Sequence, residues 1–225
     1  WSSDVCSSDL LMLTWLAGSQ VTTQTVMVLD EVFVLLIIKE ALAGLLLGFV
    51  ASLIFSAIQM AGAMIDLQMG FAMANLVDPQ SGVPMPVTSN LKLLLAMLFF
   101  LTIDGHHQLI QGMLASYRLI PLGQAELLHF EMTAEWLARF FAQGFLIALQ
   151  ISAPMAAALF LVDLAMGFIA RTVPQMNFFV IGFPFKMLFG FAVLFLVIPG
   201  FFVVLTYLFQ HMFEAMSQIM QLLGI

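Results

Sequence analysis

Long apolar stretches, broken by prolines and isolated charges, constrain this chain more than any other feature. The longest runs from Val32 to Leu76, far beyond the ~20 residues that a helix needs to cross a bilayer. Of the 225 residues, 63% are hydrophobic and 8% are charged, whereas a soluble domain is nearer half apolar and a quarter charged. Because so little polar surface could coat a soluble globule, the sequence predicts an all-α integral membrane protein.

The other apolar runs predict the remaining helices, and polar or proline-rich segments separate them. They cover 91–103, 108–120, 136–170 and 178–209, the last interrupted by Pro184 and Pro199. We interpret the runs as two long, broken helical hairpins, about 32–120 and 136–209, in one membrane domain.

That domain is expected to cover 11–225. Residues 1–10 contain Ser-Ser-Asp twice and match nothing that follows. They have neither the basic start nor the apolar core of a signal peptide. We therefore expect a non-native or disordered leader, followed by a truncated N-terminal helix.

The charge and cysteine content narrow the function classes. The formal net charge is −7, with only six Lys and Arg residues, so no basic patch is available and nucleic acid is not an expected partner. The single cysteine, Cys6, excludes an internal disulfide and a cysteine-based metal cluster.

A six-residue segment occurs twice. Asp66-Leu67-Gln68-Met69-Gly70-Phe71 and Asp163-Leu164-Ala165-Met166-Gly167-Phe168 agree at five of six positions, and each precedes a Pro-Gln pair. Internal repeats are common in membrane transport proteins, so the two hairpins could share one plan. Coincidence in a biased composition remains the alternative.

Four small residues recur at every fourth position and would form one ridge on a helix: Gly44, Gly48, Ser52 and Ser56. Small side chains let a second backbone approach closely in a membrane. The pattern predicts helix packing within an assembly, and ordinary small-residue usage is the alternative.

Six charged residues lie within or at the ends of apolar runs: Lys39, Glu40, Asp66, Asp104, Asp163 and Lys186. Each would cost ~2.5–3.5 kcal/mol at the centre of a bilayer. They are therefore expected to line a water path, or to lie in an assembly that is partly outside the bilayer.

The segment Asp104-Gly105-His106-His107 contains metal-ligand types. Adjacent histidines project to different faces of a helix, and no His or Glu follows at i+3 or i+4. A helix break with polar capping is favoured over a metal site, and an intramembrane metalloenzyme is a distant third class. Since no nucleophile–base pattern or phosphate-binding glycine loop occurs, we predict no catalysis, cofactor or metal.

Several motifs together resemble the FliR family, flagellar biosynthetic proteins of the type III export gate. The resemblance covers roughly Glu31 to the C-terminus. It is carried by Gln68-Met69-Gly70-Phe71, Val77-Asp78-Pro79, Met85-Pro86-Val87, Phe100-Leu101-Thr102-Ile103-Asp104-Gly105-His106, Leu119-Ile120-Pro121, Ala170-Arg171, Pro174-Gln175-Met176-Asn177 and Phe179-Val180-Ile181-Gly182-Phe183-Pro184-Phe185-Lys186.

The resemblance implies a multi-pass subunit of the bacterial cytoplasmic (inner) membrane, in the flagellar basal body. It implies assembly with FliP-like and FliQ-like subunits, and with an FlhB-like gate subunit, into a helical channel that exports unfolded flagellar proteins.

The resemblance also implies two sets of site residues. A loop of the family plugs the closed pore, and the matching residues here are Asp78, Pro79, Gln80, Ser81, Gly82, Val83, Pro84, Met85, Pro86 and Val87. Interior polar positions and family motifs fall at Asp66, Asp104, Asp163, Arg171, Pro174, Gln175, Asn177, Gly182, Pro184 and Lys186.

The alternative function is a small-molecule secondary transporter. Such proteins bind substrate where membrane helices are discontinuous, and Pro154, Pro184 and Pro199 could mark such breaks.

Overall fold

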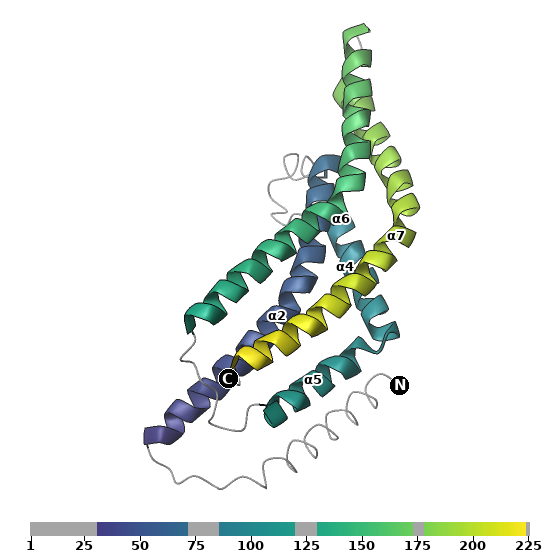
Figure 1. The fold of residues 1–225 in the computed structure, drawn as a ribbon. Coiled ribbons are helices and arrows are strands. Elements are labelled where there is room, and N and C mark those ends of the chain that lie inside the picture. Colours follow the sequence, from purple (N-terminus) through teal and green to yellow (C-terminus); the bar gives the residue numbers. More distant parts are fainter. Residues whose placement is uncertain (1–30, 72–85, 120–129, 173–177, 224–225) are drawn as a thin grey trace, which may run out of the picture. The chain divides into compact units, whose positions relative to one another are not determined.

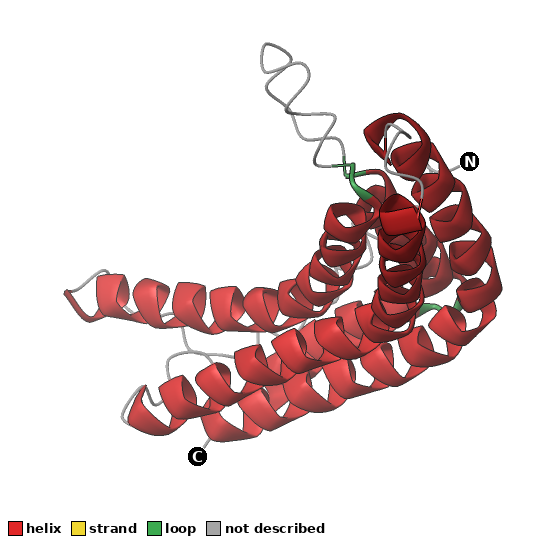
Figure 2. Cartoon of the chain, turned by 90° about the horizontal axis from the view of Figure 1, so that it is seen from above, coloured by secondary structure: helices red, strands yellow, loops and turns green. Residues whose placement is uncertain are grey.

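The described part of the chain is built from helices. The computed structural model describes residues 31–71, 86–119, 130–172 and 178–223, and no strand occurs among them (Figure 2). The helices, labelled in Figure 1, are α2 (Glu31–Met69), α4 (Val87–Thr102), α5 (Gly105–Leu119), α6 (Phe130–Thr172) and α7 (Phe178–Leu223). The predicted all-α class is confirmed for these residues.

Three of the described helices are long and apolar enough to cross a membrane, over Ile37–Met69, Met132–Thr172 and Gly182–Leu222. A fourth span results if the bent pair α4 and α5, broken between Thr102 and Gly105, is counted as one. The predicted multi-pass membrane architecture is therefore confirmed.

The prolines inside the long helices do not end them. Helix α6 continues through Pro154, and α7 continues through Pro184 and Pro199. The expected interruptions of the last apolar run are wrong. Ending a helix in an apolar medium frees many more backbone groups than one proline does. The discontinuous helices on which the transporter alternative depended are absent at these three positions.

The described residues form two compact units, and α2, α6 and α7 each contribute to both. Unit 2 contains residues 52–71, 86–103, 138–172 and 178–209. Its core is a cluster of buried side chains from α2, α6 and α7: Ile65, Met69, Met155, Leu159 and Leu194. Phe55, Phe100 and Phe209 pack against one another elsewhere in the unit, with ring centroids 5.0–5.7 Å apart.

Unit 1 contains residues 31–51, 104–119, 130–137 and 210–223. Its buried apolar side chains come mainly from α2 and α7, and include Leu47, Val50, Met212, Met216 and Ile219. The indole Nε1–H of Trp136 on α6 donates to the side-chain oxygen of Gln218 on α7 at 3.3 Å. This contact links the first turns of α6 to the end of α7.

Candidate functional site

The carboxylate of Asp66, in unit 2, caps the N-terminus of another helix. Its Oδ1 accepts a hydrogen bond from the N–H of Thr88 at 2.8 Å, and its Oδ2 accepts one from Ser89 at 3.0 Å. The first N–H groups of a helix have no partner within it, and the N-cap residue Pro86 supplies no side-chain bond to α4. Asp66 is only 5% exposed, so the backbone N–H groups stabilise its charge, and the contact ties α2 to α4.

The residues after Asp66 end α2 in a Schellman turn. The N–H of Phe71 donates to the carbonyl of Asp66 at 3.1 Å, and the N–H of Gly70 donates to that of Leu67 at 3.3 Å. Gly70 has a φ of +87°, which favours glycine. A Cβ at Gly70 would also come within 2.8 Å of the Phe183 ring. The first copy of the six-residue segment therefore both ends α2 and caps α4.

The backbones of α2 and α4 lie in close contact beside this cap. A Cβ at Gly62 would overlap the Cα of Ser89, and the Ser89 hydroxyl donates to the carbonyl of Gln59 at 2.8 Å. Glycine is therefore required at position 62 for the two helices to approach this closely.

The second copy of the segment makes an ion pair instead of a helix cap. The ammonium of Lys186 on α7 lies 2.7 Å from Oδ1 and 2.8 Å from Oδ2 of Asp163 on α6. The side chain of Lys186 is 18% exposed and that of Asp163 is 51% exposed. Two charges predicted separately in apolar runs are thus partners, and their pairing lowers the cost of placing both in a membrane subunit.

Lys92 on α4 is a buried cation in unit 2. Its residue exposure is 3%, and its Nζ has no hydrogen-bond partner among the described residues. The Nζ lies 5.4 Å from the centroid of the Phe201 ring on α7, a distance suited to a cation–π interaction. A small apolar cavity, lined in part by Leu95 and Leu194, adjoins both residues.

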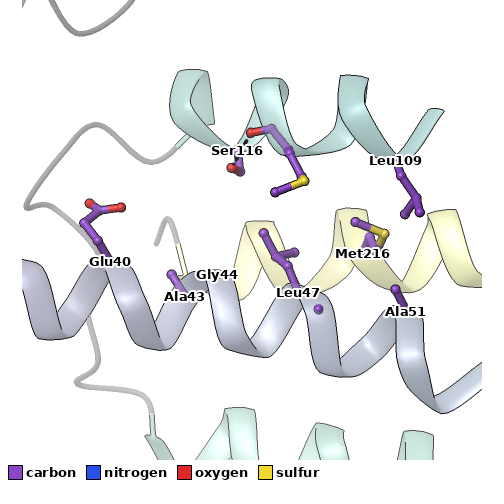
Figure 3. Close-up of a pocket in the computed structure, with 10 residues that line it drawn as sticks. Glu40, Ala43, Gly44, Leu47, Ala51, Leu109, Ser116 and Met216 are labelled. Atoms are coloured by element: carbon purple, nitrogen blue, oxygen red, sulfur yellow. Dashed lines mark hydrogen bonds between the residues drawn. The ribbon is translucent and has the colours of Figure 1, made fainter. Parts of the chain in front are cut away.

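The predicted ridge of small residues is exposed on α2. Gly44, Gly48, Ser52 and Ser56 all face outward, and a Cβ at Gly44 or Gly48 would meet no atom within 4 Å. Within unit 1, both glycines border a cavity of about 210 Å³, which Figure 3 shows between α2 and α5. Its other lining residues are Glu40, Ala43, Leu47, Ala51, Leu109, Met113, Ser116 and Met216.

Asp104 marks the break between α4 and α5. It is exposed and has a φ of +54°, the left-handed region that Asp tolerates better than most residues. Its carbonyl accepts the N–H of Gln108 at 3.2 Å, which forms the first turn of α5. The expected helix break at this motif is therefore present.

The other predicted site residues lie apart from these contacts or outside the described residues. Arg171 is exposed in the last turn of α6, while Gly182 is buried and Pro184 is exposed on α7. Of the predicted plug, Pro86 and Val87 are described at the start of α4. The remaining predicted positions, which lie outside the described residues, are Pro174, Gln175, Asn177, Asp78, Pro79, Gln80, Ser81, Gly82, Val83, Pro84 and Met85.

Three notable residues were missed from the sequence: Gly62, Lys92 and Gly190. Lys92 met the criterion of a charge within an apolar run and could have been selected by it. Gly190 adjoins Met69, whose Cε would lie 2.6 Å from an added Cβ. No local signal distinguishes Gly62 or Gly190 from the other glycines, because the atoms beside them belong to residues distant in sequence. These are the backbone of Ser89 for Gly62 and the flexible side chain of Met69 for Gly190.

Long apolar helices joined by buried polar contacts define a multi-pass α-helical membrane protein. Residues 9–212 match the family described as "Bacterial export proteins, family 1". The chain is 43% identical over 199 residues to flagellar biosynthetic protein FliR of Bacillus subtilis, covering 88% of this chain and 76% of that protein. It is 31% identical over 209 residues to FliR of Escherichia coli K12, covering 93% and 79%.

A virulence-secretion relative is similar over a shorter region. Yop proteins translocation protein T of Yersinia pestis is 33% identical over 152 residues, covering 68% of this chain and 58% of that protein. The chain belongs to the bacterial export protein family that includes FliR. It is thus a non-enzymatic, multi-pass component of the flagellar export gate in the inner membrane.

Proposed function

We propose that this chain assembles with FliP-like and FliQ-like subunits into the export channel, beside an FlhB-like gate subunit. Unfolded flagellar proteins are the proposed substrates. The observation that carries the proposal is the exposed ridge on α2, where Gly44 and Gly48 border a cavity between α2 and α5. This surface supports a role as a packing subunit within a larger helical assembly.

The physics of helix association in lipid favours this use of the ridge. Lipid tails are as apolar as the side chains, so close van der Waals packing, rather than the hydrophobic effect, drives association. A bare glycine surface offers that packing only to another helix that approaches closely. A helix of a partner subunit that seats on Gly44 and Gly48 would gain these contacts.

Co-expression tests the proposal. Produced alone, the chain should be unstable or aggregate, and FliP-like and FliQ-like subunits should rescue it and co-purify with it. A stable, monodisperse monomer that binds neither subunit would contradict the proposed assembly.

Substitution at Gly48 tests the ridge itself. Gly48→Leu should abolish co-purification while membrane insertion remains normal, because leucine inserts readily but holds the helices apart. Gly48→Ala is the matched control, since alanine keeps a small surface, and it should retain assembly. Equal assembly of both variants would show that the ridge does not contact a partner.

We also propose that Asp78 to Val87 forms the plug of the closed channel. Its three prolines and Gly82 disfavour a continuous helix, and Met85 provides an adaptable apolar side chain. The chain on either side is anchored, because Gly70 ends α2 in a fixed turn and Asp66 holds the first turn of α4.

Deletion of Gln80 to Pro84 tests the plug. Passive ion conductance across the membrane should rise and growth should slow, while the complex still assembles. Conductance at the wild-type level, in a complex shown to be intact, would contradict the plug and show that the loop only connects two helices.

A further inference from the structure

The break between α4 and α5 brings three metal-ligand side chains together within unit 1. Asp104, His106 and His107 each offer one ligand atom, and these atoms all lie within 4.8 Å of one another. We propose that these residues bind a divalent transition-metal ion, of which Zn²⁺ is the representative.

Adjacent histidines on a helix are expected to diverge, but the side chains of His106 and His107 converge in the structure. Nδ1 of His107 lies 3.3 Å from Nε2 of His106, and the two rings are tilted by 71° with centroids 5.1 Å apart. Two nitrogens bound to one tetrahedral Zn²⁺ at about 2.0–2.1 Å would be about 3.3–3.4 Å apart. The separation of the two imidazole nitrogens already suits a shared ion.

The carboxylate of Asp104 completes a donor set of two nitrogens and one oxygen. Imidazole and carboxylate together suit zinc and its neighbours in the transition series, whereas Mg²⁺ and Ca²⁺ prefer oxygen ligands alone. Three protein ligands leave a fourth tetrahedral position for water or for a ligand from another subunit. Asp104 and His107 are exposed, so an ion can reach the site without the helices parting.

The backbone at the break determines where these ligands lie. Asp104 is held at a φ of +54°, and its carbonyl accepts the N–H of Gln108 in the first turn of α5. An ion bound by residues 104, 106 and 107 would link the break to that turn and stabilise both. The buried Nδ1 of His106 has no hydrogen-bond partner among the described residues, so we expect weaker binding than at a zinc site whose outer contacts are complete.

Metal titration of the full chain tests the proposal. The protein, purified in mild detergent with its bound subunits through a histidine-free tag, is titrated with Co²⁺, and Zn²⁺ is added to displace it. We expect visible absorption bands of tetrahedral Co²⁺, one Zn²⁺ per copy of this chain, and no competition from Mg²⁺.

Substitution of each proposed ligand tests whether the ion binds at this site. His106→Gln and His107→Gln should weaken Zn²⁺ binding by more than the about 10–100-fold that loss of an outer contact costs. Asp104→Asn should weaken it as well, and asparagine preserves the break because it also tolerates the left-handed conformation. The double variant His129→Gln/His211→Gln is the control and should bind like the unmodified chain.

The same preparations distinguish loss of the ion from loss of the fold. Far-ultraviolet circular dichroism and retention of the bound subunits should be unchanged in every variant. Zn²⁺ binding that survives His107→Gln at full affinity, or an unmodified chain that retains no Zn²⁺ above the level of the His106→Gln variant, would overturn the proposal.

Discussion

The two copies of the six-residue segment have nearly the same sequence but different structures. Asp66 to Phe71 ends α2, with Gly70 at a φ of +87°. The equivalent Gly167 has no positive φ, and α6 continues past it to Thr172. The surroundings also differ, since Gly70 lies against Phe183 while a Cβ at Gly167 would meet nothing within 4 Å.

The two aspartates, by contrast, bind partners at the same distance along the sequence. Asp66 bonds to Ser89 and Asp163 bonds to Lys186, and each contact spans 23 residues. In the first hairpin the acceptor is buried and the donors are backbone N–H groups. In the second, both partners are side chains and Asp163 is half exposed. The same sequence separation can therefore link two helices in either of two ways. In one, backbone N–H groups bind the carboxylate, and in the other a lysine side chain does.

The largest expected effect comes from adding bulk at Gly62 in the first hairpin. Gly62→Leu would overlap the backbone of Ser89, which no rotamer can relieve, so α2 and α4 must separate. We expect a loss of at least about 3 kcal/mol of unfolding free energy, at the upper end of overpacking costs. The yield of folded subunit from membranes and its Tm measure the effect.

Gly167→Leu is the control, at an open glycine in the second hairpin. Position 167 is exposed and open, so we expect a change within about 0.5 kcal/mol. Equal damage at both glycines would mean that position 167 is packed as tightly as position 62.

The next largest effect is the difference in stability between the alanine variants of Asp66 and Asp163. Asp66→Ala leaves two buried N–H groups without a partner, at about 1–3 kcal/mol each. Asp163→Ala breaks an ion pair whose carboxylate is half exposed, so we expect a smaller loss than for Asp66→Ala. Thermal unfolding of the two purified variants should therefore give a much lower Tm for Asp66→Ala. Similar Tm values would show that the ion pair is as desolvated as the helix cap.

The smallest expected change in Tm comes from replacing either of two lysines, Lys92 and Lys186. Lys92→Met replaces a buried cation that lacks a hydrogen-bond partner among the described residues with an apolar side chain of similar size. We expect stabilisation by about 1 kcal/mol, because the desolvation cost of the charge disappears. Lys186→Met should instead lower the Tm slightly, since it leaves Asp163 unpaired. A lower Tm for Lys92→Met would show that its attraction to Asp66 and its contact with Phe201 together outweigh the cost of burial.

The sequence by itself determined the class of this protein. Composition and run length led to multi-pass helices, because a bilayer requires long apolar segments whose backbone bonds are satisfied internally. Contiguous motifs such as Phe100 to His106 were sufficient to indicate the family. The break at Asp104 was also predictable, since local backbone preference produces it.

Only the tertiary structure decided which residues work together. Asp66 was predictable as an interior charge but not as the cap of α4, because its partners come from a helix that begins about twenty residues later. The requirement for glycine at position 62 arises from the backbone of Ser89. The convergence of His106 and His107 depends on ring orientation, which sequence spacing does not specify. Long-range contacts of this kind depend on how the helices pack, and local sequence patterns do not specify them.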